Sequence, residues 1–68
     1  MDGIFEGLDT SAKIKAFMAT RNIRQIEIAD LLNMTTETIR QRLNANRWEI
    51  TELRIIADKY GIEVRDLI

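Results

Sequence analysis

Cysteine, histidine and proline are absent from the 68 residues of the chain, and glycine occurs only three times. Without cysteine or histidine the chain lacks disulfides and the usual zinc ligands, so helix packing must supply its stability. The same absence removes the commonest nucleophile and the commonest general base. The sequence has no glycine-rich phosphate loop, and a chain this short has little room for a substrate pocket. We therefore expect no enzyme activity, no cofactor and no small-molecule substrate.

Long apolar runs are also missing. None approaches the roughly 20 residues that a membrane-spanning helix needs, and the N-terminus does not read as a signal peptide. Apolar residues make up 46% of the chain and charged residues 31%, which is typical of a soluble globular domain. We expect a protein with no membrane contact, and the absence of cysteine is compatible with the cytoplasm.

Charge is distributed unevenly, although the net charge is only −1. Residues 13–47 carry seven basic and three acidic side chains, a balance of +4, whereas residues 1–12 carry −3 and residues 48–68 carry −2. A basic middle between acidic ends gives a local field that attracts phosphate, since salt limits the reach of charges to about 10 Å. Chance partition of charge in a short chain is the alternative explanation.

Helical spacing of apolar residues predicts an all-α protein, a compact bundle of four to five short helices. We expect helices before residue 22, from about 25 to 32, from 36 to 44 and from 52 to 60, with a last turn at 63–67. The expected N-caps are Thr10 or Ser11, Thr35 and Thr51. The expected left-handed or chain-breaking residues after the helices are Asn22, Asn33 and Gly61. The expected core residues are Ile14, Phe17, Met18, Ile28, Leu31, Leu32, Ile39, Leu43, Leu53, Ile56, Ala57 and Tyr60.

The third helix is short and mostly polar, with Ile39 and Leu43 as its inward pair. A helix so poor in apolar residues buries one narrow edge, which is unusual in a small protein unless the exposed face is used. Trp48, the single tryptophan, follows in a loop at residues 45–50. We expect it in the core, since large aromatic side chains dominate small cores, and stacking on a sugar or at an interface is the alternative.

Residues 25–44, QIEIADLLNMTTETIRQRLN, resemble the helix-turn-helix of lambda-repressor-like proteins, the family of phage repressors and Cro. In that family glutamine opens the first motif helix, a small alanine lies where the second helix crosses, and the turn needs a residue that tolerates positive φ. The matching residues here are Gln25, Ala29, Asn33, Met34 in the apolar turn position, Thr35 and Ile39. The resemblance extends over roughly residues 11–67.

Three positions depart from the family pattern. Arg42 occupies a place that is often apolar, and Glu37 puts an acid near the start of the reading helix. Ala45 stands where glycine commonly follows asparagine, so Asn44 or Asn46 is expected to take the left-handed conformation instead.

The resemblance implies a sequence-specific regulator of transcription that reads the major groove of double-stranded DNA with the helix at 36–44. It would be a Cro-like or repressor-like protein of a phage, prophage or bacterium, located in the bacterial cytoplasm or nucleoid. The alternative is a protein-interaction module, such as an antirepressor or antitoxin, on the same fold. The expected base-reading residues are Thr36, Glu37, Arg40 and Gln41. For Glu37 an equally good explanation is an acid favoured by the dipole at a helix start. The residues expected to contact phosphate are Gln25, Arg24, Arg42, Asn46 and Arg47.

We divide the chain into a flexible N-terminal arm, residues 1–10, and a helix-turn-helix DNA-binding domain, residues 11–68. Family members bind DNA as pairs, on half-sites about one helical turn apart, so the resemblance implies a homodimer at least on DNA. The candidate self-contact is an apolar C-terminal end, which closing the core of the single chain would explain equally well. Its residues are Ile62, Val64, Leu67 and Ile68.

Overall fold

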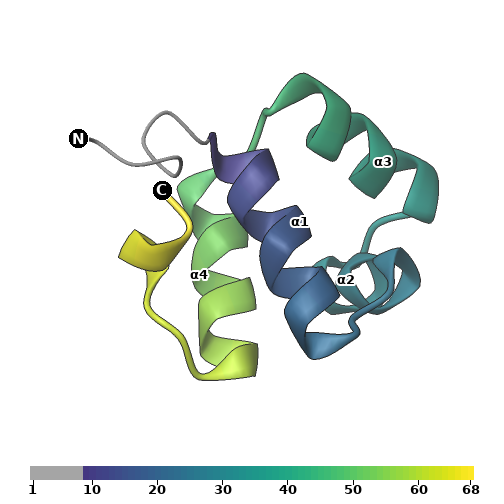
Figure 1. Ribbon diagram of the computed structural model, residues 1–68. Coiled ribbons are helices and arrows are strands. Elements are labelled where there is room, and N and C mark those ends of the chain that lie inside the picture. The colour runs from purple at the N-terminus through teal and green to yellow at the C-terminus, as the bar shows by residue number, and fades with distance from the viewer. Residues whose placement is uncertain (1–8) are drawn as a thin grey trace.

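Four α-helices and a terminal 3-10 turn make up the part of the chain that the computed structural model describes, residues 9–68. The elements are α1 (Thr10–Arg21), α2 (Gln25–Leu32), α3 (Thr36–Ala45), α4 (Ile50–Tyr60) and the turn η1 (Val64–Asp66). No strand occurs within residues 9–68. In Figure 1, α4 lies on one side of α1, and α2 and α3 lie on the other. The all-α bundle expected from the sequence is confirmed.

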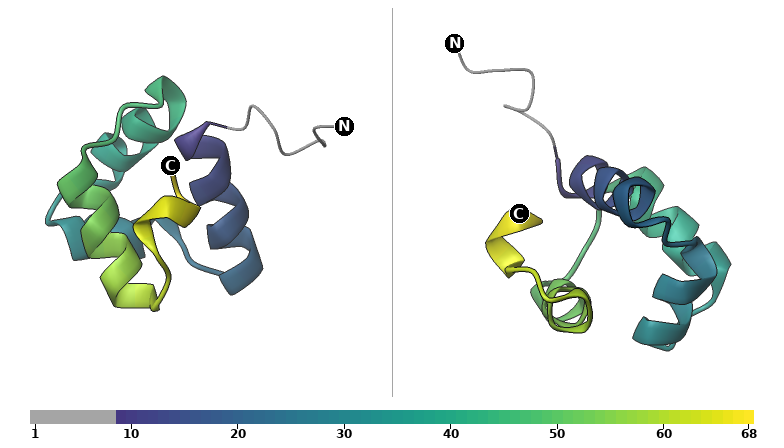
Figure 2. Two further views of the ribbon diagram at one scale, coloured as in Figure 1. Left: turned by 90° about the vertical axis from the view of Figure 1, so that its left-hand side faces the viewer. Right: turned by 60° about the horizontal axis from the view of Figure 1, so that its bottom comes forward.

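One isoleucine from each helix lies fully buried at the centre of the bundle. These four side chains, each with 0% exposure, are Ile14, Ile28, Ile39 and Ile56. Leu67, directly after η1, is 1% exposed and joins the same cluster. The left view of Figure 2 shows η1 beside α4, on the side toward α1. Burial of each such side chain contributes roughly 1.5–3 kcal/mol, so all four helices and the C-terminal turn are tied to one core.

Some of the residues that the sequence places in the core are more exposed than predicted. Four of the expected core residues are only half-buried, namely Phe17, Leu31, Leu32 and Tyr60. The rings of Phe17 and Tyr60 meet edge to face with centroids 5.4 Å apart, and the Arg21 guanidinium lies over the Phe17 ring. Phe17 and Tyr60 therefore meet at the edge of the core, where α1 faces α4.

The connection between α2 and α3 follows from the backbone of Asn33. Asn33 has a φ of 59°, a left-handed conformation that asparagine tolerates better than most residues. The Met34 amide then donates to the Ala29 carbonyl at 2.8 Å and ends α2. Thr35 is the N-cap of α3, and its hydroxyl accepts from the Thr38 amide at 3.1 Å. The predicted left-handed residue and the predicted cap of this turn are both confirmed.

The predicted start of the first helix is wrong by one or two residues. Asp9, rather than Thr10 or Ser11, caps α1, and its carboxylate accepts from the Ala12 amide at 2.8 Å. A carboxylate at this position also interacts with the positive end of the helix dipole, which a neutral hydroxyl does only weakly. Residues 1–8 are not described, so most of the arm expected at residues 1–10 lies outside the described part of the chain. Residues 9 and 10 are the cap and the first residue of α1.

The predicted start of the fourth helix is also wrong. Helix α4 begins at Ile50, and Thr51, the expected cap, lies inside the first turn. The start is set by Glu49 and Glu52, which form a capping box. In it the Glu49 amide donates to the Glu52 carboxylate at 2.9 Å. A glutamate pair three residues apart therefore replaces the hydroxyl cap.

The helix ends agree better with the sequence. Asn22 after α1 and Gly61 after α4 have φ values of 57° and 69°, as their predicted left-handed conformations require. Helix α3 extends to Ala45, one residue beyond the predicted end. Of the two asparagines considered for the left-handed conformation there, Asn46 adopts it, with a φ of 53°, and Asn44 stays helical. Asparagine thus ends three of the four helices.

Candidate nucleic-acid interface

The outward face of α3 carries the side chains predicted to read bases. Ile39 and Leu43 lie on the inner edge of the helix, where they are 0% and 5% exposed. The four predicted readers all lie on exposed positions of the same helix, at Thr36, Glu37, Arg40 and Gln41. Helix α3 lies at the periphery of the bundle in Figure 1. It is therefore anchored along one edge and offers hydrogen-bonding groups along the rest.

Glu37 and Arg40 form an ion pair on this outward face. Arg40 Nη2 lies 2.6 Å from each of the two carboxylate oxygens of Glu37. The side chains are 59% and 57% exposed, so water screens the pair. The hydrogen bond from Arg40 and its charge lower the pKa of Glu37, with a smaller contribution from the Gln41 side chain. The same pairing raises the pKa of Arg40. Two of the four predicted readers, Glu37 and Arg40, are thus paired with each other.

Arg24 and Gln25 stand at the N-terminal end of α2. Arg24 is the N-cap residue and Gln25 the first residue of the helix, and both are exposed. The Arg24 amide donates to Glu27 Oε2 at 2.9 Å, and Arg24 Nε lies 3.6 Å from the same oxygen. The Arg24 side chain is 78% exposed. An arginine at the positive end of a helix is well placed for an anion, although Glu27 offsets part of its charge.

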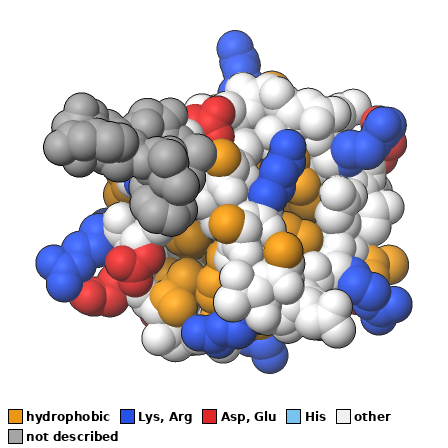
Figure 3. Space-filling model, viewed as in Figure 1, with side chains coloured by type: hydrophobic (Ala, Val, Ile, Leu, Met, Phe, Trp, Pro, Cys, Tyr) orange, Lys and Arg blue, Asp and Glu red, His pale blue; other side chains and the backbone are white. Residues whose placement is uncertain are grey.

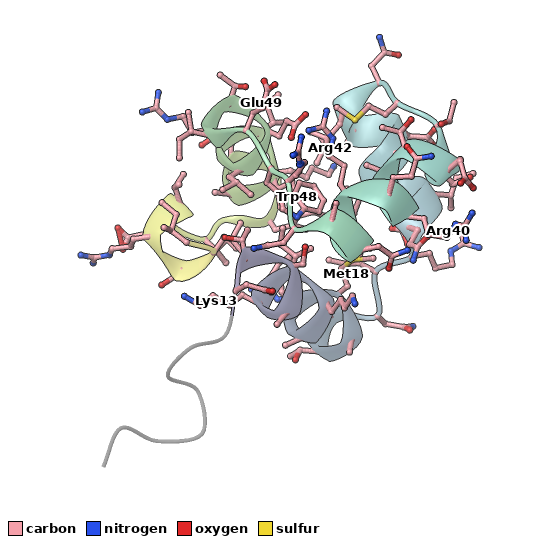
Figure 4. The ribbon with its side chains drawn as sticks, turned by 90° about the horizontal axis from the view of Figure 1, so that it is seen from above. Lys13, Met18, Arg40, Arg42, Trp48 and Glu49 are labelled. Atoms are coloured by element: carbon pink, nitrogen blue, oxygen red, sulfur yellow. The ribbon has the colours of Figure 1, made fainter. Side chains whose placement is uncertain are left out.

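Arg42 is only partly exposed, and its guanidinium is already paired within the protein. Its Nη2 is 2.9 Å from Glu52 Oε2, and its Nη1 donates to the Arg47 carbonyl at 3.1 Å. The side chains of Arg42 and Glu52 are 25% and 8% exposed. Figure 4 shows Arg42 directed toward α4 and Trp48, whereas Arg40 points away from the body of the protein. The guanidinium that the sequence assigns to phosphate therefore joins α3 to α4, and sequence reasoning missed its partner Glu52.

Asn46 and the buried Ser11 join the end of α3 to the start of α1. Asn46 Oδ1 accepts from the Ser11 amide at 2.9 Å. The Ser11 hydroxyl donates to the Arg42 carbonyl at 3.2 Å and accepts from Trp48 Nε1 at 3.0 Å. Trp48 is half-buried and packs against the core, in agreement with the expected core position. The oxygen of the Asn46 side chain is thus used inside the protein.

Arg47 is the exposed basic residue of this region. It lines two shallow hollows, of about 310 Å³ and about 360 Å³, and shares both with Arg42. Because Glu52 offsets the charge of Arg42, Arg47 is the guanidinium available to solvent beside the C-terminal end of α3. On the face shown in Figure 3, basic side chains stand apart from one another and do not merge into one patch. An anion contact on that face would depend on single, spaced basic side chains.

The C-terminal apolar residues divide between core and surface. Leu67 is 1% exposed and belongs to the core cluster, so for this residue closure of the single chain's own core is the correct alternative. Ile62 and Val64 are half-buried and pack against the same cluster. Of the four candidate self-contact residues, Ile68 is the one left largely exposed, at 59%.

Within residues 9–68 no cluster of three or more acidic side chains is arranged to hold a metal ion, and no helix has the length and apolar character to cross a membrane. Comparison of the chain with protein-family models, with curated proteins and with solved structures finds no match.

Proposed function

We propose that the protein is a sequence-specific, double-stranded DNA-binding regulator of transcription, in which α2 and α3 act as a helix-turn-helix and α3 enters the major groove. The observation that carries the proposal is the outward face of α3, where four exposed hydrogen-bonding side chains lie on a helix anchored from behind by two buried residues. The major groove, about 12 Å wide, admits an α-helix and presents a distinct pattern of donors and acceptors for each base pair. The polar face of α3 suits that pattern.

Each of the four predicted base-reading residues can form a specific contact with the edge of one base. Gln41 can donate to and accept from adenine, and Arg40 can donate to the two acceptors of guanine. Thr36 can contact the methyl group of thymine, and Glu37 can accept from the N4 amino group of cytosine. A recognition helix presents its N-terminal residues to the bases, and all four lie within the first six residues of α3.

Contacts with phosphate come from residues on both sides of α3 in the chain. Arg24 and Gln25 lie at the start of α2, where free amides and the helix dipole favour an anion. Arg47 follows α3 and is exposed. We assign the main phosphate contact after α3 to Arg47, because Glu52 already holds Arg42. Such contacts supply affinity and register but no sequence information.

A pair of protomers on one site fits the size of the domain. A single module of this kind buries only about 600–1,000 Å² on DNA. Two copies on half-sites about 34 Å apart would double the contact, as in other helix-turn-helix proteins. We propose a homodimer on DNA that acts as a repressor of the Cro type.

Selection from a pool of random duplexes at near-physiological salt tests the proposal. We expect enrichment of a short motif, in two copies spaced by about ten base pairs. A double variant with Arg40→Ala and Gln41→Ala should keep its helical circular dichroism and bind the enriched duplex about 100-fold more weakly, roughly tenfold per lost base contact. A matched variant with Arg54→Ala, which also removes one positive charge but from an exposed position of α4, should bind like the unaltered protein.

A protein-interaction module remains the second candidate, favoured by a specific observation. The protein has a net charge of −1 and a pI of about 5.3, and Glu37 offsets the charge of the one arginine on the outward face of α3. If no duplex is retained even at about 50 mM salt, where phosphate contacts strengthen sharply, the DNA-binding proposal is wrong and this second function takes its place.

A further inference from the structure

We infer that Glu37 determines the sequence specificity of the DNA interface, by restraining Arg40 from indiscriminate phosphate contact and by requiring a base edge with an amino group, such as cytosine N4. The inference rests on the proposed function and deepens it. It concerns one residue of the outward face of α3, and it gives the acid that departs from the family pattern a positive role.

The geometry of the pair leaves Arg40 only partly engaged. Both carboxylate oxygens of Glu37 bind the same nitrogen, Nη2, so Glu37 does not occupy Nη1 or Nε. A guanidinium bound in this way keeps donors for a guanine while a neighbouring carboxylate lies against another of its nitrogens. Before DNA binds, the pair therefore already presents one acceptor, the Glu37 carboxylate, and several donors on Arg40, one helical turn apart.

The negative charge of Glu37 makes the affinity depend on the DNA sequence. On an arbitrary duplex the Glu37 carboxylate faces phosphates and offsets the positive charge of Arg40, so attraction to the backbone is weaker by about one charge. On a site with cytosine opposite Glu37, the carboxylate accepts a hydrogen bond from the cytosine N4 amino group. This hydrogen bond compensates for the weaker attraction to the backbone. Because an exposed ion pair is weak, Arg40 is easily released to the correct base.

A purely structural role for Glu37 predicts different behaviour. Glu37 is the second residue of α3, where any acid is favoured by the helix dipole. If that were its whole role, Glu37→Asp would preserve it, and removal of the charge would alter the stability of the fold without altering the choice of DNA. A shorter carboxylate at position 37 does not reach Arg40 or a base in the same way. The two roles therefore predict different effects of the Glu37 variants on the preference for one DNA sequence over another.

The test compares the unaltered protein, Glu37→Gln, Glu37→Asp and the matched control Glu63→Gln. Glu63 is also exposed and also pairs with an arginine, Arg65 Nη2 at 2.9 Å, but it lies beside η1, away from α3. Its substitution produces the same change of net charge. Each protein is titrated with the duplex enriched from the random pool and with a mixed-sequence duplex, between about 50 and 200 mM salt.

We expect Glu37→Gln to bind the mixed-sequence duplex about three- to tenfold more tightly at 50 mM salt, with a salt slope steeper by about 0.9, because Arg40 gains a phosphate. Its ratio of specific to non-specific affinity should fall, and its own selection should lose the preference for one C·G pair. Glu37→Asp keeps the charge, so its salt slope should stay, but its ratio should also fall because the shorter carboxylate binds the enriched duplex less tightly. Glu63→Gln should keep the original ratio and slope.

The outcomes separate the inference from the proposed function. If the unaltered protein enriches a motif but Glu37→Gln keeps the same ratio, slope and motif, Glu37 is a helix-start acid and the inference is wrong, while DNA binding stands. An equal change in Glu63→Gln would also overturn it, because net charge alone would explain the effect. If none of the four proteins retains a duplex at 50 mM salt, the proposed function itself fails.

Discussion

The indole Nε1 of Trp48 donates to the hydroxyl of Ser11 at 3.0 Å, across 37 positions of the chain. Ser11 is 3% exposed and lies in the first turn of α1, and its hydroxyl donates in turn to the Arg42 carbonyl near the end of α3. One buried hydroxyl thus connects the start of α1, the end of α3 and the loop before α4. The position of the candidate recognition helix depends on this connection.

Ser11→Ala should lower the free energy of unfolding by about 1 kcal/mol, because the partly buried Trp48 N–H loses its acceptor. The Arg42 carbonyl keeps another donor, the Arg47 amide at 3.3 Å, so the indole carries most of the cost. Urea unfolding followed by the fluorescence of Trp48, the single tryptophan, measures the change.

Thr20→Ala is the control for the loss of a hydroxyl on the same helix. Thr20 is exposed, and its hydroxyl donates to the Ala16 carbonyl at 2.9 Å within α1. Its replacement should change the free energy of unfolding by less than about 0.5 kcal/mol. Equal losses in the Ser11 and Thr20 variants would mean that the hydrogen bond to Trp48 contributes nothing of its own.

Arg42→Ala and Arg47→Ala should separate a structural arginine from a DNA-contacting one. Arg42→Ala leaves the Glu52 carboxylate, 8% exposed, without its partner and should cost about 2 kcal/mol, less than the 3–5 kcal/mol of a fully buried pair. Arg47→Ala should leave stability within about 0.5 kcal/mol and reduce the salt slope of DNA binding by about 1. Chemical denaturation and binding at several salt concentrations measure the two effects, and a reversed pattern would contradict the assignment.

Local features of the fold could be predicted because each depends on a few neighbouring residues. Asn33 and Thr35 fix the turn before α3 through their own backbone conformation and hydroxyl, and helical spacing alone identifies Ile39 as buried. The helix starts were harder to place, because Asp9 and Thr10 are both good caps on chemical grounds. The structure selects Asp9, whose carboxylate accepts from the Ala12 amide.

The side-chain network of the candidate site could be predicted only in part. Glu37 and Arg40 are three residues apart on one helix, so their pairing follows from helix geometry. The partners of Arg42 and Asn46, by contrast, lie 10 and 35 positions away, at Glu52 and Ser11. Residues so far apart in the sequence come into contact only because α1 and α4 pack against α3. Tertiary packing therefore determines which polar residues are used internally and which remain for a ligand.

Asn33→Gly and Asn46→Gly should differ in stability although both residues have the same left-handed backbone, with φ values of 59° and 53°. Glycine adopts this conformation freely, so Asn33→Gly should be neutral within about 0.5 kcal/mol. Asn46→Gly also removes the oxygen that accepts from the Ser11 amide and should cost about 1 kcal/mol. Thermal unfolding of the two variants checks this, and equal stability would show that the bond from Asn46 to α1 is dispensable.

Removal of Arg40 should change how Glu37 titrates. In the unaltered protein the hydrogen bond and the charge of Arg40 hold the pKa of Glu37 below its usual value of 4.5. In Arg40→Gln the pKa should rise toward 4.5, which an NMR titration of the Glu37 side-chain carboxyl carbon measures directly. Because the folded-state pKa of Glu37 is the lower one, the pair stabilises the fold at neutral pH. That contribution is lost as pH falls through the folded-state value, so any stability difference between the two proteins should vanish in strong acid. An unchanged Glu37 midpoint in Arg40→Gln would show that the pair does not persist in solution, and would remove the restraint on Arg40 from which the role of Glu37 in specificity was inferred.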